Sequence, residues 1–456
     1  MLSENKNMLN DVKHIHFIGV GGTGMYPIVQ ILAEKGYTIT GSDRKESTNT
    51  IAEKKMGIKI FFEHKSENIN GADLVVYSAA VPADNPELAA ARENGIKIAE
   101  RAEMLGLLTS WFNNCICVCG THGKTTTTSM ITQIMLDTGK DPTAFIGSKL
   151  PAIGGNGRLG KSENMVCESC EFKDTFLHLY PDVALILNVD EDHLDYFKNL
   201  DNIIKSFRKF AEMTRKTIIV NGDDENSMKA VEGLNKEIIT YGLTSKNDYY
   251  AENIETDKLN QSYDLMYKGH KLCRIRLSVP GTHNIYNSVG ACVAAIISGV
   301  KAEEIPNTLI NYKGAERRFQ VLGENNGITI VDDFAHHPKE IEGTLNIAKS
   351  LGYKKVWAVF QPYTYSRMAL LKDDFIRVLK IADRVVMTEI VSAREDNTYN
   401  IYTSDFTKEI PNSCGFNSFE EITEYVMTHA EKGDLVVTMG GGDIYFCSKM
   451  LINYGK

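Results

Sequence analysis

A glycine-rich segment that starts at Cys119 and reads CGTHGKTTTT constrains the fold more than any other part of the chain. The apolar run from Cys115 predicts a strand before it, and a helical pattern begins at Thr125. A strand, a glycine turn and a helix N-terminus form a phosphate cradle, because backbone N–H groups and the helix dipole face the anion. Lys124 can reach outer phosphates, and the Thr125 hydroxyl can hold Mg²⁺. Val118 stands where the strict G-x-x-x-x-G-K-[ST] pattern has glycine, so an ordinary glycine turn beside a surface lysine stays the alternative.

The length of the chain indicates more than one core. A chain of 456 residues predicts about three domains. Hydrophobic content of 43% and charged content of 24% are typical of a globular protein, and a net charge of −9 argues against a general nucleic-acid binder. The polar start, MLSENKNMLNDVK, does not resemble a signal peptide, and no apolar run approaches the ~20 residues that span a bilayer. We therefore expect a cytoplasmic protein without membrane or nucleic-acid partners.

The cysteines do not form a disulfide pattern. There are nine, an odd number. Cys115, Cys117 and Cys119 alternate along the predicted strand, so they share one face and are expected in the core. Cys167 and Cys170 form a C-x-x-C pair, but a redox or zinc role requires a helix start or a second ligand pair, and neither is evident.

The first block of the chain has the pattern of a dinucleotide-binding fold. A strand over His14–Ile18 leads into Gly19-Val20-Gly21-Gly22-Thr23-Gly24, a G-x-G-x-x-G turn that opens a helix from Tyr26 to Lys35. A second strand ends before Asp43, which follows the turn by about 20 residues, the spacing at which an acid meets a ribose. A tight turn that touches no ligand is the alternative interpretation.

In the second block, polar residues follow two further strands. Glu168 comes directly after Met165–Cys167, and a cluster with Asp190, Asp192 and His193 follows Val183–Leu187. Parallel strands end at one sheet edge, so these groups should flank the phosphate loop and could hold a cation there. Solvated strand ends, or helix caps at Asp190 or Asp192, are the alternative.

Two later segments carry further polar clusters. His283, Asn284 and Asn287 precede a small-residue helix predicted at Ser288–Ile297, where they would serve as caps or face an adenine edge. The third block starts near Lys313, and its strand-end loops contain ERRF, DDFAHHP and FQPYTYSR before a closing GGGD turn. His336 and His337 suggest zinc, but adjacent histidines on a strand end point apart and no third ligand is evident.

The ordered motifs resemble those of the Mur ligase family over nearly the whole chain. They are GVGGTGM, GTHGKTTTT, NVDEDHLD, GTHNxxN, ERRFQ, DDFAHHP, SARE and GGGDI. The resemblance implies an α/β protein of three domains: a Rossmann-like UDP-sugar domain at 1–109, a central P-loop-type ATP-binding domain at 110–312, and a Rossmann-like C-terminal domain at 313–456 that closes over the amino acid and nucleotide. The first glycine turn would then hold the pyrophosphate of a UDP-sugar.

Within the family, the motifs are most similar to the branch that adds L-alanine to UDP-N-acetylmuramate for peptidoglycan. The implied reaction uses ATP and Mg²⁺, converts the lactyl carboxylate to an acyl phosphate, and lets the alanine amine displace phosphate. A monomer or weak homodimer is expected. The alternatives are a recycling ligase that attaches a tripeptide to the same sugar, and a non-catalytic nucleotide-binding regulator. Intact Lys124, Thr125, Glu168 and His193 argue against the regulator.

The resemblance also implies residue roles. Lys124 would neutralise the outer phosphates, Thr125 and Glu168 would hold a first Mg²⁺, and His193 would hold a second between the γ-phosphate and the substrate carboxylate. The implied nucleotide-binding residues are Gly120, Thr121, His122, Gly123, Lys124, Thr125, Thr126, His283, Asn284, Asn287, Arg317 and Asp332. The implied substrate-binding residues are Gly21, Thr23, Gly24, Asp43, His64, Ser78, Arg101, His336, Tyr363 and Arg367.

Two positions depart from the family pattern. The alanine-adding members usually have His where this chain has Tyr363, and Tyr where it has Phe334. Arg367 remains to pair with the alanine carboxylate and would be the stronger anchor. Some relatives carry a carbamylated lysine near the second metal, and neither Lys205 nor Lys209 is assigned that role.

Overall fold

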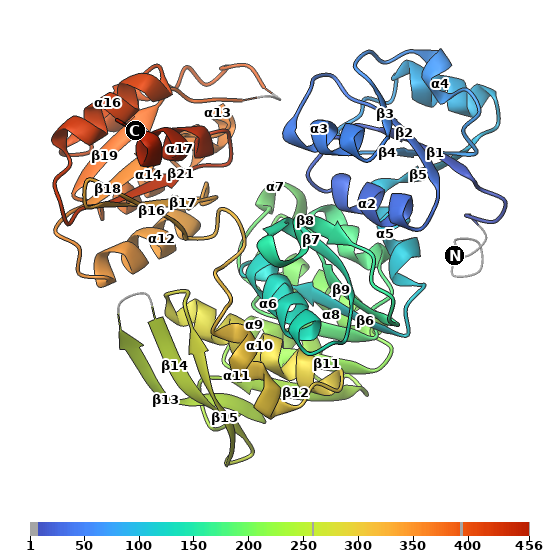
Figure 1. The fold of residues 1–456 in the computed structure, drawn as a ribbon, viewed down its shortest axis with the longest axis horizontal. Coiled ribbons are helices and arrows are strands. Elements are labelled where there is room, and N and C mark those ends of the chain that lie inside the picture. Colours follow the sequence, from blue (N-terminus) through green and yellow to red (C-terminus); the bar gives the residue numbers. More distant parts are fainter. Residues whose placement is uncertain (1–7, 258–259, 393–394, 456) are drawn as a thin grey trace. The chain divides into compact units, whose positions relative to one another are not determined.

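The computed structural model describes residues 8–257, 260–392 and 395–455 (Figure 1). Its contacts divide the chain into two compact units. The first consists of Met1–Glu255, Ser262–Leu277 and Thr282–Tyr312, and the second of Thr256–Gln261, Ser278–Gly281 and Lys313–Lys456. The three sheets with their helices confirm the predicted α/β class. The boundary between residues 109 and 110 stays a prediction.

The first sheet of the first unit is parallel, with the strand order β3-β2-β1-β4-β5. Its strands are β1 (His14–Ile18), β2 (Thr38–Ser42), β3 (Lys59–Phe61), β4 (Leu74–Tyr77) and β5 (Lys97–Glu100), and its helices are α2 (Tyr26–Glu34), α3 (Thr48–Lys55), α4 (Pro86–Glu93) and α5 (Arg101–Thr109). The order reverses at β1, which lies between β2 and β4. Ligands bind at such switch points, and the predicted glycine turn follows β1 there.

The second sheet has the order β15-β14-β13-β12-β11-β10-β6-β9-β7-β8. Its strands are β6 (Asn114–Cys119), β7 (Thr143–Leu150), β8 (Gly155–Arg158), β9 (Asn164–Glu168), β10 (Val183–Ile186), β11 (Thr217–Asn221), β12 (Glu237–Gly242), β13 (Tyr249–Asp257), β14 (Asn260–Tyr267) and β15 (His270–Leu277). Strand β6 lies between β9 and β10 and is parallel to both. The loops after β9 and β10 therefore flank the loop after β6, as predicted.

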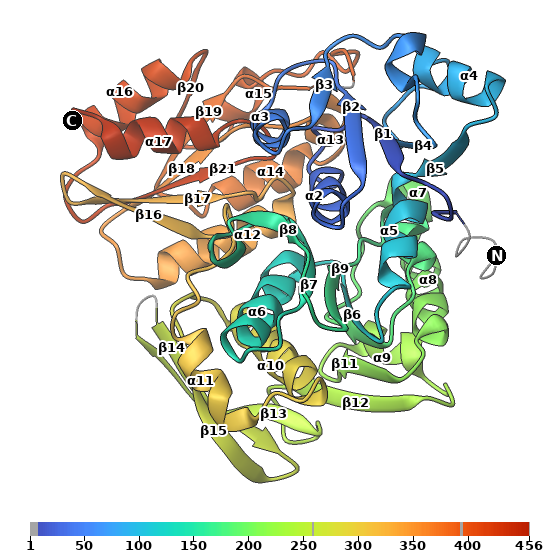
Figure 2. The same cartoon turned by 45° about the vertical axis from the view of Figure 1, so that its right-hand side comes forward.

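The helices of this part are α6 (Lys124–Asp137), α7 (Leu194–Phe197), α8 (Leu200–Met213), α9 (Glu225–Val231), α10 (Thr282–Ile297) and α11 (Ile305–Leu309). Helices α6 and α10 lie side by side against the sheet (Figure 2). A small residue lets α10 pack closely on the sheet, because a Cβ atom on Gly290 would lie 3.1 Å from the Tyr241 ring of β12. None of the described helices is long and apolar enough to cross a membrane.

The sheet of the second unit has the order β16-β17-β21-β18-β19-β20. Its strands are β16 (Gln320–Asn325), β17 (Ile328–Asp333), β18 (Val356–Phe360), β19 (Arg384–Thr388), β20 (Ser413–Phe416) and β21 (Leu435–Met439), and its helices are α12 (Pro338–Ser350), α13 (Tyr365–Leu370), α14 (Lys372–Leu379), α15 (Ser404–Thr407), α16 (Phe419–His429) and α17 (Tyr445–Asn453). Only β16 runs antiparallel to its neighbour. The loops after β17, β21 and β18 consequently meet at one edge.

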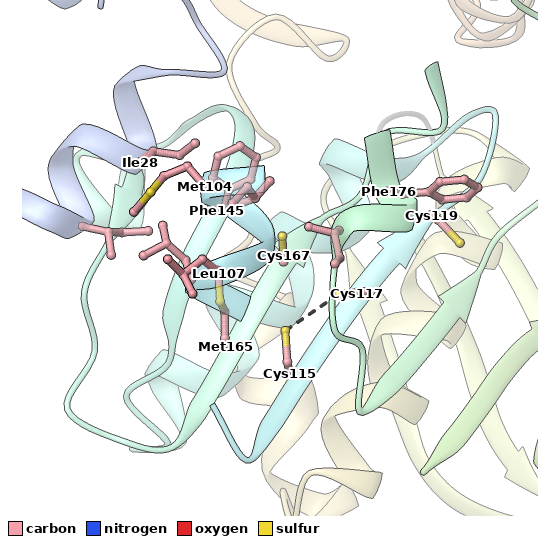
Figure 3. Packing of buried hydrophobic residues seen from close by; sticks show 14 of the residues in the cluster. Ile28, Met104, Leu107, Cys115, Cys117, Cys119, Phe145, Met165, Cys167 and Phe176 are labelled. Atoms are coloured by element: carbon pink, nitrogen blue, oxygen red, sulfur yellow. Dashed lines mark hydrogen bonds between the residues drawn. The ribbon is translucent and has the colours of Figure 1, made fainter. Parts of the chain in front are cut away.

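One apolar cluster joins the first sheet to the second. It includes Ile28 of α2, Met104 of α5, and Phe145 and Phe176 of the central part (Figure 3). The prediction that Cys115, Cys117 and Cys119 are core residues is confirmed, because all three are fully buried in this cluster. Cys167 is also buried there, whereas Cys170 is exposed and free.

The helical layer of the first sheet contains a buried carboxyl group that has no hydrogen-bond partner among the described residues. Glu53 of α3 is fully buried, and neither of its oxygens has a hydrogen-bond partner among the described residues. Burial, reinforced by the charge of Asp43, raises the pKa of Glu53 to about 8. A neutral acid is favoured there because an unpaired buried carboxylate is costly.

We expect Glu53 to make the protein less stable as the pH rises. Its pKa is raised in the folded state, so folding retains a proton that the unfolded chain loses above its ordinary pKa. The protonated Glu53 contributes its full stabilisation below about pH 4.5, and this contribution is lost as the pH rises towards about 8. The free energy of unfolding should fall by up to a few kcal/mol over this range. Thermal unfolding of Glu53→Gln should show a weaker decline of Tm over this range. Glu46→Gln, at an exposed acid of the same part, is the control, and parallel pH profiles for parent and Glu53→Gln would contradict the assignment.

Candidate active site

The predicted phosphate loop consists of Gly120 to Gly123, between β6 and α6, and its conformation needs glycine at two positions. Gly120 has a φ of 146° and Gly123 a φ of 84°, both outside the range that other residues readily adopt. A Cβ atom on Gly120 would lie 2.9 Å from the Leu187 side chain, and one on Gly123 would lie 2.4 Å from the Asn287 Oδ1 atom. Helix α6 begins immediately afterwards, at Lys124. Its free N–H groups and dipole therefore face the space that the loop encloses.

The loop after β10 fixes the phosphate loop from one side. The N–H of Thr121 donates to the Asn188 carbonyl (3.0 Å), and the N–H of His122 donates to Asn188 Oδ1 (2.8 Å). The Asn188 amide returns a hydrogen bond to the His122 carbonyl (3.0 Å), and the Asp190 N–H donates to Thr121 Oγ1 (2.9 Å). Sequence reasoning did not single out Asn188, whose pattern signal is only its place at a strand end.

Two acids, one at the end of β9 and one just after it, each contact one residue that is predicted to bind phosphate or metal. Thr125 Oγ1 donates to Glu168 Oε1 (2.9 Å), and the Gly147 N–H donates to Glu168 Oε2 (2.6 Å). Lys124 Nζ lies 3.0 Å from Glu171 Oε1 and 2.9 Å from Oε2. Burial alone would lower the pKa of Lys124, but the charge of Glu171 raises it overall. Lys124 therefore remains charged.

The predicted first metal position fits Mg²⁺ chemically. A hydroxyl and a carboxylate lie in contact at Thr125 and Glu168, and both offer the oxygen atoms that Mg²⁺ prefers. Among the described residues no group of three or more His, Cys, Asp or Glu side chains could hold a metal by itself. Mg²⁺ typically needs only one or two protein carboxylates beside phosphates and waters. Both metal roles stay predictions.

His193 lies on the other side of β6 from Glu168, in the loop after β10. Its φ of 51° is left-handed, and its ring packs 4.5 Å from the ring of Phe172. Its Nε2 atom is 3.7 Å from Asp192 Oδ2. The cap interpretation is wrong for helix α7: Asp190 and Asp192 each accept the N–H of the next residue, and α7 begins at Leu194 with His193 as its N-cap residue and without a side-chain cap.

The predicted start of the small-residue helix was wrong. Helix α10 begins at Thr282 and not at Ser288, so His283, Asn284 and Asn287 lie in its first two turns. The buried Asn287 donates to Asn284 Oδ1 (3.1 Å) and packs against Gly123. The structure thus places Asn287 against the phosphate loop, with Asn284 bonded to it. The contact of both residues with adenine stays a prediction.

A cavity of about 320 Å³ connects three predicted sugar-site residues to Glu168. Thr23, Gly24 and Arg101 line it from the first sheet, and Phe145, Gly147 and Glu168 line it from the second. A Cβ atom on Gly24 would lie 3.4 Å from Arg101 Nη1, so Gly24 and Arg101 are direct neighbours in this wall. The cavity can therefore place a substrate next to the carboxylate that contacts the phosphate loop.

The other predicted sugar-site residues lie around the same glycine turn or behind it. Asp43 Oδ2 accepts the Gly21 N–H (2.9 Å) and closes the turn, and Ser78 lies beside Gly19. His64 Nδ1 is 2.8 Å from Glu87 Oε2. Fully buried Glu87, which sequence reasoning missed, also accepts hydrogen bonds from Ser42 (2.7 Å) and Asn68 (2.6 Å). It orients His64.

In the second unit, Arg317 stabilises the glycine turn after β21. Its Nε donates to Asp332 Oδ2 (3.0 Å), and its Nη1 and Nη2 donate to the carbonyls of Gly442 (3.0 Å) and Gly440 (2.7 Å). Burial raises the pKa of Asp332, although Arg317 opposes this shift. Three of the five N–H donors of Arg317 are used within the unit, and its contact with nucleotide stays a prediction.

Arg367 contrasts with Arg317. Its Nη1 atom is buried and has no hydrogen-bond partner among the described residues. His336 and Tyr363 both lie beside Gly441, where a Cβ atom would be 3.4 Å and 3.7 Å from their Cγ atoms. Burial and, in part, the charge of Arg367 lower the pKa of His336. His336 thus lies near both Tyr363 and Arg367, and the buried Nη1 of Arg367 can donate to an anion. Of the SARE motif, Ala393 and Arg394 lie outside the described residues.

Comparison with known proteins identifies the family. Models of three Mur ligase domains match this chain: the family's catalytic domain over residues 14–113, the middle domain over 118–295, and the glutamate ligase domain over 317–442. The chain belongs to the Mur ligase family. It is 44% identical to the UDP-N-acetylmuramate–L-alanine ligase of Caldanaerobacter subterraneus, covering 98% of this chain and 99% of the relative. It is 43% identical to the ligase of the same description from Alkaliphilus metalliredigens, covering 97% and 98%.

Solved structures show the same three-domain α/β fold. The UDP-N-acetylmuramate–alanine ligase of Thermotoga maritima superposes with a TM-score of 0.82 at 27% identity, covering 96% of this chain and 98% of that one. A murein peptide ligase from Psychrobacter arcticus superposes with a TM-score of 0.74 at 24% identity, covering 97% and 98%. The second likeness shows the fold alone.

Glu168→Ala and His193→Ala should each raise the Mg²⁺ concentration that gives half-maximal ATP-dependent turnover. Loss of one ligand should shift it about tenfold or more. Glu163→Gln, at the exposed start of the same strand region, is the control for Glu168. If Mg²⁺ titrations of the two alanine variants overlay that of the parent, these side chains are structural and the metal lies elsewhere.

Proposed function

We propose that this chain joins L-alanine to the lactyl carboxylate of UDP-N-acetylmuramate, using ATP and an acyl-phosphate intermediate. Identity of 42–44% over nearly the full length to curated ligases of that name supports the ligation. The observation that supports the mechanism is the cavity shared by Thr23, Gly24, Arg101 and Glu168. It offers a sugar-phosphate substrate a place beside the phosphate loop.

The chemistry requires activation because a carboxylate is a poor electrophile. A lactyl carboxylate oxygen attacks the γ-phosphorus, the bond to the β-phosphate oxygen breaks, and ADP leaves. The alanine amine then attacks the acyl carbon, the C–O bond to phosphate breaks, and the nitrogen loses its proton. Positioning and charge neutralisation supply most of the rate in such reactions.

Residues of the first unit would bind the phosphates. Lys124 would neutralise outer-phosphate charge, and the α6 N-terminus would donate hydrogen bonds. Thr125 and Glu168 would hold a Mg²⁺ ion, with His193 at a second, and bound metal would supply further neutralisation of phosphate charge. Asn284 and Asn287 are the proposed adenine contacts. Thr23, Gly24 and Arg101 would orient the UDP-sugar, whose pyrophosphate faces the turn closed by Asp43.

Residues of the second unit would bind the amino acid. The unpartnered Nη1 of Arg367 supports it as the anchor of the alanine carboxylate. His336, with a lowered pKa, is neutral near pH 7 and can accept a hydrogen bond. Tyr363 would orient the substrate through its hydroxyl. Cytoplasmic location and the monomeric or weakly dimeric state stay predictions.

Phosphate release separates this function from its alternatives. With ATP and UDP-N-acetylmuramate, the parent protein should release phosphate when L-alanine is added. Lys124→Ala should reduce that rate by several orders of magnitude without altering the melting curve, because the transition-state charge loses its cation, at a cost of several kcal/mol. Lys229→Ala, at an exposed position of α9, should retain activity. A response to tripeptide alone would indicate the recycling ligase, and no response to either would indicate a non-catalytic protein.

We expect Arg367→Ala to raise the KM for L-alanine far more than the KM for ATP, because a bidentate carboxylate contact is lost. Tyr363→Phe should cost only about 1 kcal/mol in kcat/KM, the scale of one neutral hydrogen bond. Arg377→Ala, at an exposed arginine of α14 paired with Glu342, should change neither constant. If glycine or serine surpasses L-alanine in kcat/KM, the assigned amino-acid specificity is wrong.

A further inference from the structure

Glu171 is a buried acid at the phosphate loop with no role assigned in the reaction above. Its side chain is 3% exposed, and the Lys124 side chain is 15% exposed. Lys124 Nζ contacts both oxygens of the Glu171 carboxylate, at 3.0 Å from Oε1 and 2.9 Å from Oε2, and no other donor among the described residues bonds to either oxygen. The carboxylate therefore depends on a single ammonium group for its stabilisation.

All three donors of that ammonium group are already used. Lys124 Nζ donates to the carbonyls of Gly120 and Thr121 and to Glu171. An ammonium has three N–H donors and no more. A phosphate that binds Lys124 must therefore displace one of these acceptors. Glu171 is the one that becomes unfavourable, because it brings negative charge against the arriving anion.

We propose that Glu171 is a positioning residue that holds Lys124 while the loop is empty and is replaced by an outer phosphate when nucleotide binds. The inference rests on the proposed nucleotide site. The Thr125 hydroxyl likewise donates to Glu168 (2.9 Å). In the empty loop, Lys124 and Thr125 are thus each paired with an acid of one short segment. The pairing keeps the buried ammonium compensated between reaction cycles, and it lowers the affinity for nucleotide.

Removing the charge of Glu171 should therefore strengthen nucleotide binding. Glutamine keeps the shape of the side chain, but it leaves Lys124 without a counter-charge in the empty protein. The nucleotide-bound protein loses less, since a phosphate faces Lys124 there. Structural damage would weaken nucleotide binding. An increase in the affinity for nucleotide therefore distinguishes a positioning residue from a merely structural one.

The test is calorimetric titration of ADP and AMP into parent and Glu171→Gln, with Mg²⁺ and with EDTA. The Kd for ADP should fall about fivefold or more in the variant, and the Kd for AMP, which lacks the outer phosphates, should not change. Glu171→Asp, which keeps the charge but withdraws it, should shift ADP in the same direction by less. It also serves if Glu171→Gln fails to fold.

Asp182→Asn is the matched control. Asp182 is a buried acid that lies at the opposite end of β6 and pairs with Arg215 (2.8 Å). Its replacement by Asn changes the net charge of the protein by the same amount as Glu171→Gln. It should leave the Kd for ADP unchanged. Unchanged or weaker ADP binding in Glu171→Gln, or equal tightening of AMP, or tightening in Asp182→Asn, overturns the inference. If the parent binds no ADP, the proposed nucleotide site fails together with it.

Discussion

The position of the Glu168 carboxylate connects the parts of the first unit's site. One oxygen accepts the Thr125 hydroxyl at the start of α6, and the other accepts the Gly147 N–H in β7. The same side chain lines the cavity that Arg101 enters from the first sheet. A Cβ atom at residue 147 would lie 2.5 Å from Glu168 Oε1, so glycine there is a condition for this geometry. The phosphate loop and the sugar cavity thus share one oriented carboxylate.

Orientation of that kind is supplied by the sheet. Because β9, β6 and β10 are adjacent and parallel, their carboxyl ends bring an acid, a lysine loop and a histidine loop to one edge. The Asn188 side chain then holds the phosphate loop by two hydrogen bonds. Such preorganisation matters because a group that must reorganise during the reaction stabilises the transition state less.

Much of this arrangement was predictable from the sequence, since it depends on local patterns. The strands before Gly120 and Glu168 have continuous apolar runs, and parallel pairing follows from their alternation with helices. The start of α10 was not predictable in the same way. Its first turns contain Asn284 and Asn287, which normally favour caps, but here they bond to each other and pack on Gly123. The sequence indicated no role for Glu171 or Glu87, because their partners, Lys124 and His64, are distant in sequence and only the folded chain brings them together.

The two arginines of the second unit show why burial and partners decide a role that sequence leaves open. Arg317 and Arg367 both lie in polar motifs of this chain. Arg317 donates to Asp332 and to two carbonyls, whereas Arg367 has a buried Nη1 without a hydrogen-bond partner among the described residues. A buried donor without an acceptor costs free energy, about 1–3 kcal/mol or more when charged. A carboxylate ligand would remove that cost. The unsatisfied Nη1 of Arg367 therefore favours binding of an anion, although Tyr363 and Phe334 depart from the family pattern.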